Sequence, residues 1–228
     1  YTDVASAVAE LMEGERPEHF GDIHRTYEDG ERMVTTPPYT AFLKIAEGCS
    51  NGCAFCIIPK LRGRYRSRSM EALVEEARGL AASGVKELIV IAQDITRYGL
   101  DRKDGSTLAK LLDRLCELDF HWIRLHYLYP EAVTDELIET IARQPKILHY
   151  LDIPIQHCND AILKAMRRRN TRAEIEALFA KLRKAMPDVV LRTSLICGLP
   201  GEGGAEFEEL CHFLREQRIQ RAGVFQFS

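Results

Sequence analysis

Residues 40–56 read TAFLKIAEGCSNGCAFC, a mostly apolar run followed directly by three cysteines in the spacing C-x3-C-x2-C. A short apolar run that contains aromatic and β-branched residues favours a strand. Five more such runs follow, at residues 87–92, 122–128, 150–155, 189–196 and 223–227. Longer segments of helical period separate them. Six strands that alternate with helices predict a parallel sheet with right-handed crossovers.

The expected helices carry start signals of their own. Ser69 predicts an amino-terminal cap for a helix that reaches Gly84, and Thr134 precedes two acidic residues that favour the helix dipole. Residues 171–174 form a capping box for a helix that stops before Pro187. Two further helices are expected over the leucine-rich residues 108–118 and over residues 207–214.

Polar residues follow nearly every expected strand, at residues 47–49, 93–94, 129–130, 156–157 and 198–202. An open doubly wound sheet would gather such residues at one switch point, whereas a barrel brings the carboxyl ends of all its strands to one face. The pattern therefore favours an α/β fold with a partial, six-stranded, TIM-like parallel barrel over residues 37–228.

The composition narrows the class of protein. The 228 residues are 46% hydrophobic and 29% charged, with a net charge of −3, which excludes a disordered, fibrous or polycationic chain. No apolar run approaches the roughly 20 residues that cross a bilayer, and the amino terminus lacks the features of a signal peptide. We therefore expect no membrane partner. Seven cysteines, an odd number, indicate thiols or metal ligands in the cytoplasm rather than a disulfide framework.

Residues 1–36 contribute little to the expected core. Thr2 predicts the cap of a short amphipathic helix that ends near Gly14, and a polar stretch with a turn at Asp29-Gly30 follows. The chain has no initiating methionine and stops on an apolar run. We expect residues 1–36 to be a linker from a further amino-terminal domain, and the whole chain to be a piece of a longer protein.

The cysteine loop is the strongest functional signal. Thiolates are soft ligands that suit iron–sulfur clusters and zinc. A structural zinc site takes four protein ligands, usually from two paired knuckles, but only Cys49, Cys53 and Cys56 cluster here and the chain has no second C-x2-C. Three thiolates on a four-iron cubane leave one iron open to a substrate. The ligand count therefore favours a [4Fe–4S] cluster over zinc, and over three unrelated thiols.

This spacing resembles the radical S-adenosylmethionine superfamily, whose fold is a partial six-stranded barrel. The resemblance implies that Cys49, Cys53 and Cys56 hold the cluster, and that its open iron binds the amino and carboxylate groups of S-adenosylmethionine. Reduction would then break the sulfonium to give a deoxyadenosyl radical, while the protein positions the cofactor and excludes water. Phe55 fits the same pattern and would lie near the adenine; core packing is the alternative for this ring.

Further segments resemble the methylthiotransferase branch of this superfamily, namely residues 57–59, 62–63, 66–68, 152–157 and 196–202. Residues 91–99 and 124–130 resemble the members that act on a ribosomal protein rather than those that modify tRNA. The implied reaction adds a methylthio group to the β-carbon of an aspartate in small-subunit ribosomal protein twelve, with a reductant protein of flavodoxin or ferredoxin type. A tRNA (adenosine) methylthiotransferase is the alternative within this branch.

Full-length members of the branch resemble this chain with two flanking domains added. An amino-terminal domain supplies three more cysteines for a second [4Fe–4S] cluster, and a small carboxyl-terminal β-barrel helps to hold the substrate. Residues 1–38 contain no cysteine. We therefore expect this chain to bind one cluster and to cleave S-adenosylmethionine, without completing methylthiolation.

Several polar residues at strand ends are candidates for binding the cofactor. Gln93 and Asp94 lie where the superfamily's second-strand motif binds the methionine amino group; backbone carbonyls or a plain strand-end cap are the alternatives. Gln156 ends the fourth expected strand with His157 and could face the cofactor. The segment from Gly198 to Glu202 either lets the backbone approach a ligand or is a simple strand-to-helix turn. No residue of the chain is assigned a catalytic role.

Basic runs at residues 60–68 and 164–172 could steer an anionic partner or could be solvated faces. Without interleaved aromatic residues they give no specific RNA-binding signal. A zinc-stabilised RNA-binding module is the competing interpretation from a different class of protein. The remaining cysteines are expected to be core thiols, namely Cys116, Cys158, Cys197 and Cys211.

Overall fold

The computed structural model describes residues 3–23 and 33–228, so the expected Thr2 cap and the turn at Asp29-Gly30 lie outside the described residues. Each adjacent pair of strands in the main sheet is parallel. The six strands follow one another in sequence order: β1 (Thr40–Lys44), β4 (Glu87–Ile91), β5 (Trp122–Leu125), β6 (Ile147–Asp152), β7 (Val190–Cys197) and β8 (Arg221–Gln226). The expected six-stranded parallel α/β fold is confirmed.

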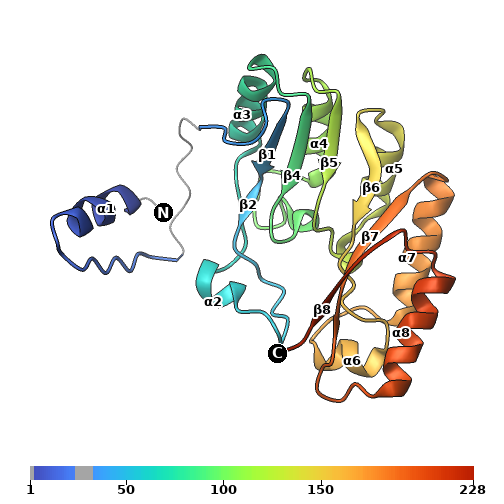
Figure 1. The fold of residues 1–228 in the computed structure, drawn as a ribbon. Helices are drawn as coiled ribbons and strands as arrows, with labels where there is room; N and C mark the ends of the chain where they lie inside the picture. Colours follow the sequence, from blue (N-terminus) through green and yellow to red (C-terminus); the bar gives the residue numbers. More distant parts are fainter. Residues whose placement is uncertain (1–2, 24–32) are drawn as a thin grey trace.

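The strand order distinguishes a barrel from a doubly wound sheet. A doubly wound sheet reverses its order at a switch point, whereas this order never reverses. The strands β1 and β8 form the two edges, and within the described part of the chain they do not pair with each other. The outer face is covered by α3 (Met70–Ala82), α4 (Leu108–Cys116), α5 (Asp135–Arg143), α7 (Arg172–Ala185) and α8 (Gly204–Glu216) (Figure 1). The sheet is therefore a partial barrel.

The core lies between the helices and one face of the sheet. Along β7, buried Leu191, Thr193 and Leu195 alternate with side chains that are partly exposed. This alternation follows from the two-residue period of a strand. The other, concave face carries ionic side chains, because Arg192 pairs with buried Asp152 at 2.7 Å. One face of the sheet is thus apolar and packed, and the other is polar and partly open.

The start signals read from the sequence agree with the observed helices. Ser69 Oγ accepts a hydrogen bond from the Ala72 amide at 3.2 Å at the start of α3. Thr134 caps α5 in the same way. Thr171 and Glu174 form a reciprocal capping box at the start of α7. These caps satisfy amide groups that the first turn of a helix leaves without a partner.

Some boundaries differ from the expectation. The strand expected over residues 122–128 ends at Leu125, because Tyr127 adopts a positive φ of 66° and leaves the extended conformation. The strand expected from Tyr150 begins at Ile147, where it pairs with Ile123 of β5. The last strand begins at Arg221, opposite Arg192 of β7. Pairing with a neighbouring strand sets the starts of β6 and β8, and the local sequence does not show that pairing.

The structure also contains short elements that the sequence patterns did not predict. Two short strands pair antiparallel beside the main sheet, β2 (Ala46–Glu47) and β3 (Arg66–Ser67). The helices α2 (Ile58–Arg62) and α6 (Asp160–Ala165) and the 3-10 turns η1 (Ile95–Arg97) and η2 (Pro130–Ala132) also appear. Elements of this length lack the periodicity that identifies longer helices and strands.

The amino-terminal helix α1 (Val4–Met12) lies apart from the sheet in Figure 1. None of its residues is buried, and Val4, Val8 and Leu11 are exposed. It ends at Met12, close to the end near Gly14 that the sequence predicts. Among the described helices, none combines the length and apolar character needed to cross a bilayer.

Candidate metal centre

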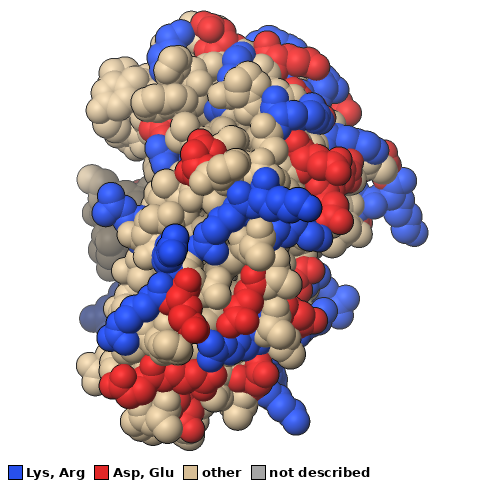
Figure 2. All heavy atoms as spheres, turned by 90° about the vertical axis from the view of Figure 1, so that its right-hand side faces the viewer, with Lys and Arg blue, Asp and Glu red and all other residues tan. Residues whose placement is uncertain are grey.

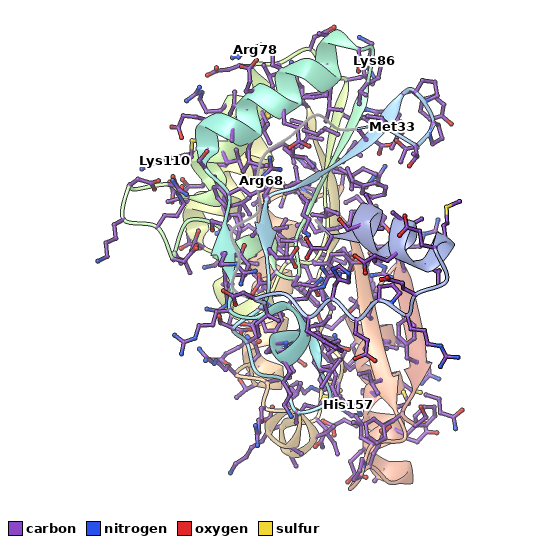
Figure 3. The ribbon with its side chains drawn as sticks, turned by 90° about the vertical axis from the view of Figure 1, so that its left-hand side faces the viewer. Met33, Arg68, Arg78, Lys86, Lys110 and His157 are labelled. Carbon is purple, nitrogen blue, oxygen red and sulfur yellow. The ribbon has the colours of Figure 1, made fainter. Side chains whose placement is uncertain are left out.

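The cysteine loop, residues 48–57, connects β2 to α2. Figure 1 places α2 below β2 and α6 near the lower edge, in the half of the molecule where the strands of the main sheet end. Figure 3 shows the direction of the strands from another side: Lys86, which precedes β4, lies at the upper end with Arg78, and His157, which follows β6, lies at the lower end. The loop therefore lies at the carboxyl ends of the strands, as the sequence pattern predicted.

The start of the loop is fixed by close contact between backbone segments. Gly48 has a positive φ of 73°, and a Cβ at this position would lie 2.2 Å from the carbonyl oxygen of Arg64. Only glycine accepts both the conformation and the contact. The Cys49 amide donates to the carbonyl of Gly63 at 3.2 Å. The first cysteine is thereby held against the segment that follows α2.

The end of the loop is attached to α6. The Ala54 amide donates to the carbonyl of Met166 at 3.0 Å. The Phe55 ring packs against a small apolar cluster of Ile162, Met166 and Leu199, separate from the main core. The packing alternative for Phe55 is therefore observed, and its proximity to an adenine stays a prediction. This attachment positions the last two cysteines over α6.

A buried carboxylate supports the middle of the loop. Asp94, fully buried after β4, accepts a hydrogen bond from Asn51 Nδ2 at 2.8 Å. It also accepts from the Thr96 amide and from Arg97 Nε, both at 3.1 Å. Asn51 lies between the first two cysteines in sequence, so its hydrogen bond to Asp94 orients this part of the loop. The strand-end cap expected for Asp94 is observed, because its carboxylate caps η1.

The second cysteine contacts a stacked pair of side chains. Cys53 Sγ lies 2.5 Å from the Tyr129 hydroxyl oxygen and 3.9 Å from a terminal guanidinium nitrogen of Arg168. The Arg168 guanidinium carbon lies 3.8 Å from the centre of the Tyr129 ring, a cation–π arrangement. A second guanidinium nitrogen donates to the carbonyl of Pro154 at 2.9 Å. Burial raises the pKa of Tyr129, so its hydroxyl stays protonated and can donate.

The donor set of the loop consists of three thiols. The three cysteines are free and partly exposed. Thiolates are the ligands that iron–sulfur clusters take. Cys49, Cys53 and Cys56, with a buried guanidinium beside one of them, fit a [4Fe–4S] cluster with three protein ligands.

Burial raises the pKa of the Cys49 thiol above its usual range. Only the thiolate binds iron, so metal binding at this residue must release a proton.

The other candidate residues lie at neighbouring strand ends. Gln93 is exposed after β4. Gln156 has a positive φ of 71° and its backbone bridges to β7 at Leu195. His157 is fully buried; its Nδ1 accepts from the Asn159 amide at 3.0 Å. Binding of the cofactor by Gln93 and Gln156 stays a prediction.

The turn after β7 is organised by its own carboxylate. Glu202 accepts from the Gly198 amide at 2.7 Å and from the Leu199 amide at 3.0 Å. Its other oxygen lies 3.6 Å from His157 Nε2, and burial lowers the pKa of that imidazole. Gly198 has a positive φ of 84°, and space is open where its side chain would be. The strand-to-helix turn is observed, and a close approach by a ligand stays a prediction.

The partial parallel barrel and the C-x3-C-x2-C loop together define the class of protein. A family model described as the radical SAM superfamily matches residues 43–214. The chain belongs to this superfamily.

Curated relatives narrow the comparison. The chain is 49% identical, over its whole length, to the ribosomal protein uS12 methylthiotransferase RimO of Caldanaerobacter subterraneus subsp. tengcongensis, of which it covers 52%. It is 54% identical over 86% of its length to the protein of the same name from Pelobacter propionicus, covering 44% of that protein. The chain thus spans about half the length of the curated relatives it matches.

Solved structures agree with the fold at low sequence identity. The radical S-adenosylmethionine methyltransferase TsrM from Kitasatospora setae, with cobalamin and a [4Fe–4S] cluster bound, matches with a TM-score of 0.69 at 16% identity; the match covers 82% of this chain and 36% of that one. Streptococcus suis SuiB bound to S-adenosylmethionine matches with a TM-score of 0.59 at 16% identity, covering 84% of this chain and 41% of that one. These matches show a shared fold.

Three side chains around the loop had no role in the sequence analysis. Asn51 lies inside the cysteine motif but shows no spacing signal of its own. Tyr129 appeared only as a polar residue after a strand, and Arg168 only as one member of a basic run. In the structure Asn51 connects the loop to Asp94, and Tyr129 and Arg168 contact Cys53 from outside the loop.

Proposed function

We propose that this chain is the radical-generating core of an enzyme that adds a methylthio group to the β-carbon of an aspartate in ribosomal protein uS12. The observation that carries the proposal is the 49% identity over the whole chain to a relative of that name. The placement of the three cysteines on one loop at the carboxyl ends of the strands supports it.

Each part of the site has a role in this proposal. Cys49, Cys53 and Cys56 would hold a [4Fe–4S] cluster, and that cluster would supply the electron for reductive cleavage of S-adenosylmethionine. Asp94 fixes the loop through Asn51. The turn at residues 198–202 and the end of β6 at Gln156 would border S-adenosylmethionine, with Phe55 and Gln93 at its margin. The concave face of the sheet would shield the radical from water.

The complete reaction needs more than this chain. Residues 37–228 form the core domain in this proposal, and residues 1–36 link it to a further domain. That domain would hold the second [4Fe–4S] cluster, the source of the transferred sulfur. A flavodoxin- or ferredoxin-type protein would supply electrons in the cytoplasm.

The charged surface bears on the RNA-binding alternative. In the face shown in Figure 2, basic and acidic side chains are interspersed. Arg172, from the second basic run, pairs with Glu176, Glu209 and Glu216 at 2.7–3.1 Å. Arg68, from the first run, pairs with Glu76 at 2.7 Å. These two arginines are therefore already paired within the chain, and the identity to the uS12 methylthiotransferase relatives is what favours a protein acceptor over RNA.

The first experiment is anaerobic reconstitution of the chain with iron and sulfide, followed by a reductant and S-adenosylmethionine. We expect about four irons per chain, the content of one cubane, and release of deoxyadenosine. Cys53→Ala should abolish both, whereas Cys211→Ala, outside the loop, should leave both intact. A protein that binds zinc and cleaves nothing would overturn the proposal. The acceptor is then tested with the full-length protein, by offering purified uS12 and tRNA and locating the added methylthio group by mass spectrometry.

A further inference from the structure

Arg168 is a buried cation in an unusual position. It follows α6 in the second basic run, and only 7% of its surface is exposed, while its neighbours Arg167 and Arg169 are exposed. Its guanidinium is held between the Tyr129 ring and the carbonyl of Pro154. The basic run thus contains one member that points inward, and the sequence pattern did not single it out.

Within the described part of the chain Arg168 forms no close ion pair, although the partly buried carboxyl of Glu131 interacts with its charge over a longer distance. No carboxylate there lies within ion-pairing distance of it, and its buried Nε has no hydrogen-bond partner. An isolated buried charge is costly unless it is paired. The nearest candidate anion is the sulfur of Cys53, 3.9 Å from a terminal nitrogen. A negative charge on that sulfur would therefore give Arg168 an ion-pair partner.

We propose, on the basis of the cluster assigned above, that Arg168 is a positioning residue that supplies the counter-charge to the Cys53 side of the cluster and raises its reduction potential. Reduction adds one electron, so a fixed positive charge beside a ligand sulfur stabilises the reduced form more than the oxidised form. Hydrogen bonds to ligand sulfurs act in the same direction. The Tyr129 hydroxyl, in contact with the same sulfur, adds to this effect.

The stacked pair explains why an arginine is needed. The planar guanidinium can lie on an aromatic ring and still direct separate N–H groups to Pro154 and to Cys53. A lysine at this position would keep the charge but would lose the stacking and one of the two directed contacts. The cluster of an Arg168→Lys variant should therefore have an intermediate potential.

The test measures the cluster itself and not turnover. Wild-type chain, Arg168→Met and the control Arg169→Met are reconstituted, and the reduced fraction is followed by EPR at a series of fixed potentials. In Arg168→Met we expect the ratio of reduced to oxidised cluster at a given potential to fall at least tenfold, equal to about 59 mV for one electron. Arg169→Met, which removes an exposed charge from the same run, should match the wild type. An unchanged potential in Arg168→Met would overturn the proposal.

A second variant covers the case in which Arg168→Met does not retain iron. Arg168→Gln removes the charge and keeps a planar amide that can still donate a hydrogen bond. A reduced-to-oxidised ratio below that of the wild type supports the proposal, and an unchanged ratio contradicts it. If the wild-type chain itself binds no iron–sulfur cluster, the proposed function fails. If it binds a cluster whose potential ignores both variants, only the inference about Arg168 fails.

Discussion

Replacing Gly48 by alanine should destabilise the chain more than the same replacement at Gly52. Both glycines lie in the cysteine loop and have a positive φ, 73° and 70°. An alanine in that conformation costs about 1–2 kcal/mol at either site. The surroundings differ, since a Cβ at residue 48 would lie 2.2 Å from the Arg64 carbonyl oxygen and 2.7 Å from that of Gly63, whereas nothing lies within 4 Å at residue 52.

The collision at Gly48 involves main-chain atoms, which cannot rotate away as a side chain can. Overpacking of this kind adds about 1–3 kcal/mol, so Gly48→Ala should lose about 2–5 kcal/mol of unfolding free energy against about 1–2 for Gly52→Ala. For a chain of this size each kcal/mol lowers the Tm by about 2–4 °C. Because the displaced segment carries Cys49, iron content after reconstitution should fall with stability in Gly48→Ala.

Urea unfolding of the apo-proteins, followed by circular dichroism, measures the difference, and iron analysis of the reconstituted chains measures the consequence. Equal losses at the two glycines would show that φ alone matters and would refute the argument from close approach. A stable Gly48→Ala protein with full iron content would refute the proposed coupling of this contact to the cysteine loop.

Three further predictions concern the surroundings of the loop. Asp94→Asn should lower the free energy of unfolding by about 3 kcal/mol, because it leaves Arg97 without its anionic partner and places an amide donor opposite the Asn51 amide. Urea unfolding midpoints measure this loss, and a loss below about 1 kcal/mol would contradict the prediction. Asn159→Ala removes the side chain that accepts hydrogen bonds from two amides of α6, and it should lower the free energy of unfolding by about 1 kcal/mol. As a control, the rate of Cys49 alkylation in the folded variant should equal that of the wild type. Burial lowers the pKa of His157 from 6.5, so the imidazole binds a proton more tightly in the unfolded chain than in the folded chain. The free energy of unfolding should therefore not depend on this group above about pH 6.5, and it should decline as the pH falls below that value. His157→Gln should make that decline shallower.

The strand runs and capping boxes could be predicted from the sequence because they are local. Thr171 and Glu174 are three residues apart, and both halves of their capping box can be seen in one turn. The cysteine spacing is local in the same sense, and it indicated the class of site without any knowledge of the fold. The start of β6 at Ile147 was missed because a partner strand determines it.

The support around the cysteines could not be predicted, because it comes from distant parts of the chain. Asn51 and Asp94 are 43 residues apart, and Arg168 is 115 residues from Cys53. Nothing in a run of arginines shows which one faces inward. That choice depends on the turn after α6, where Arg167 has a positive φ of 56° and Arg168 donates a hydrogen bond to the carbonyl of Pro154.

The attachment of the cysteine loop to α6 has a consequence for motion. Residues 48–57 of the loop contain no strand. The later half of the loop is held by the hydrogen bond from the Ala54 amide to the Met166 carbonyl and by the contact of Phe55 with the small apolar cluster. Segments that share their stabilising contacts open together, as one cooperative unit. The amide protons of the loop and of α6 should therefore exchange with solvent at matching rates, and a cluster that ties the loop down should slow both.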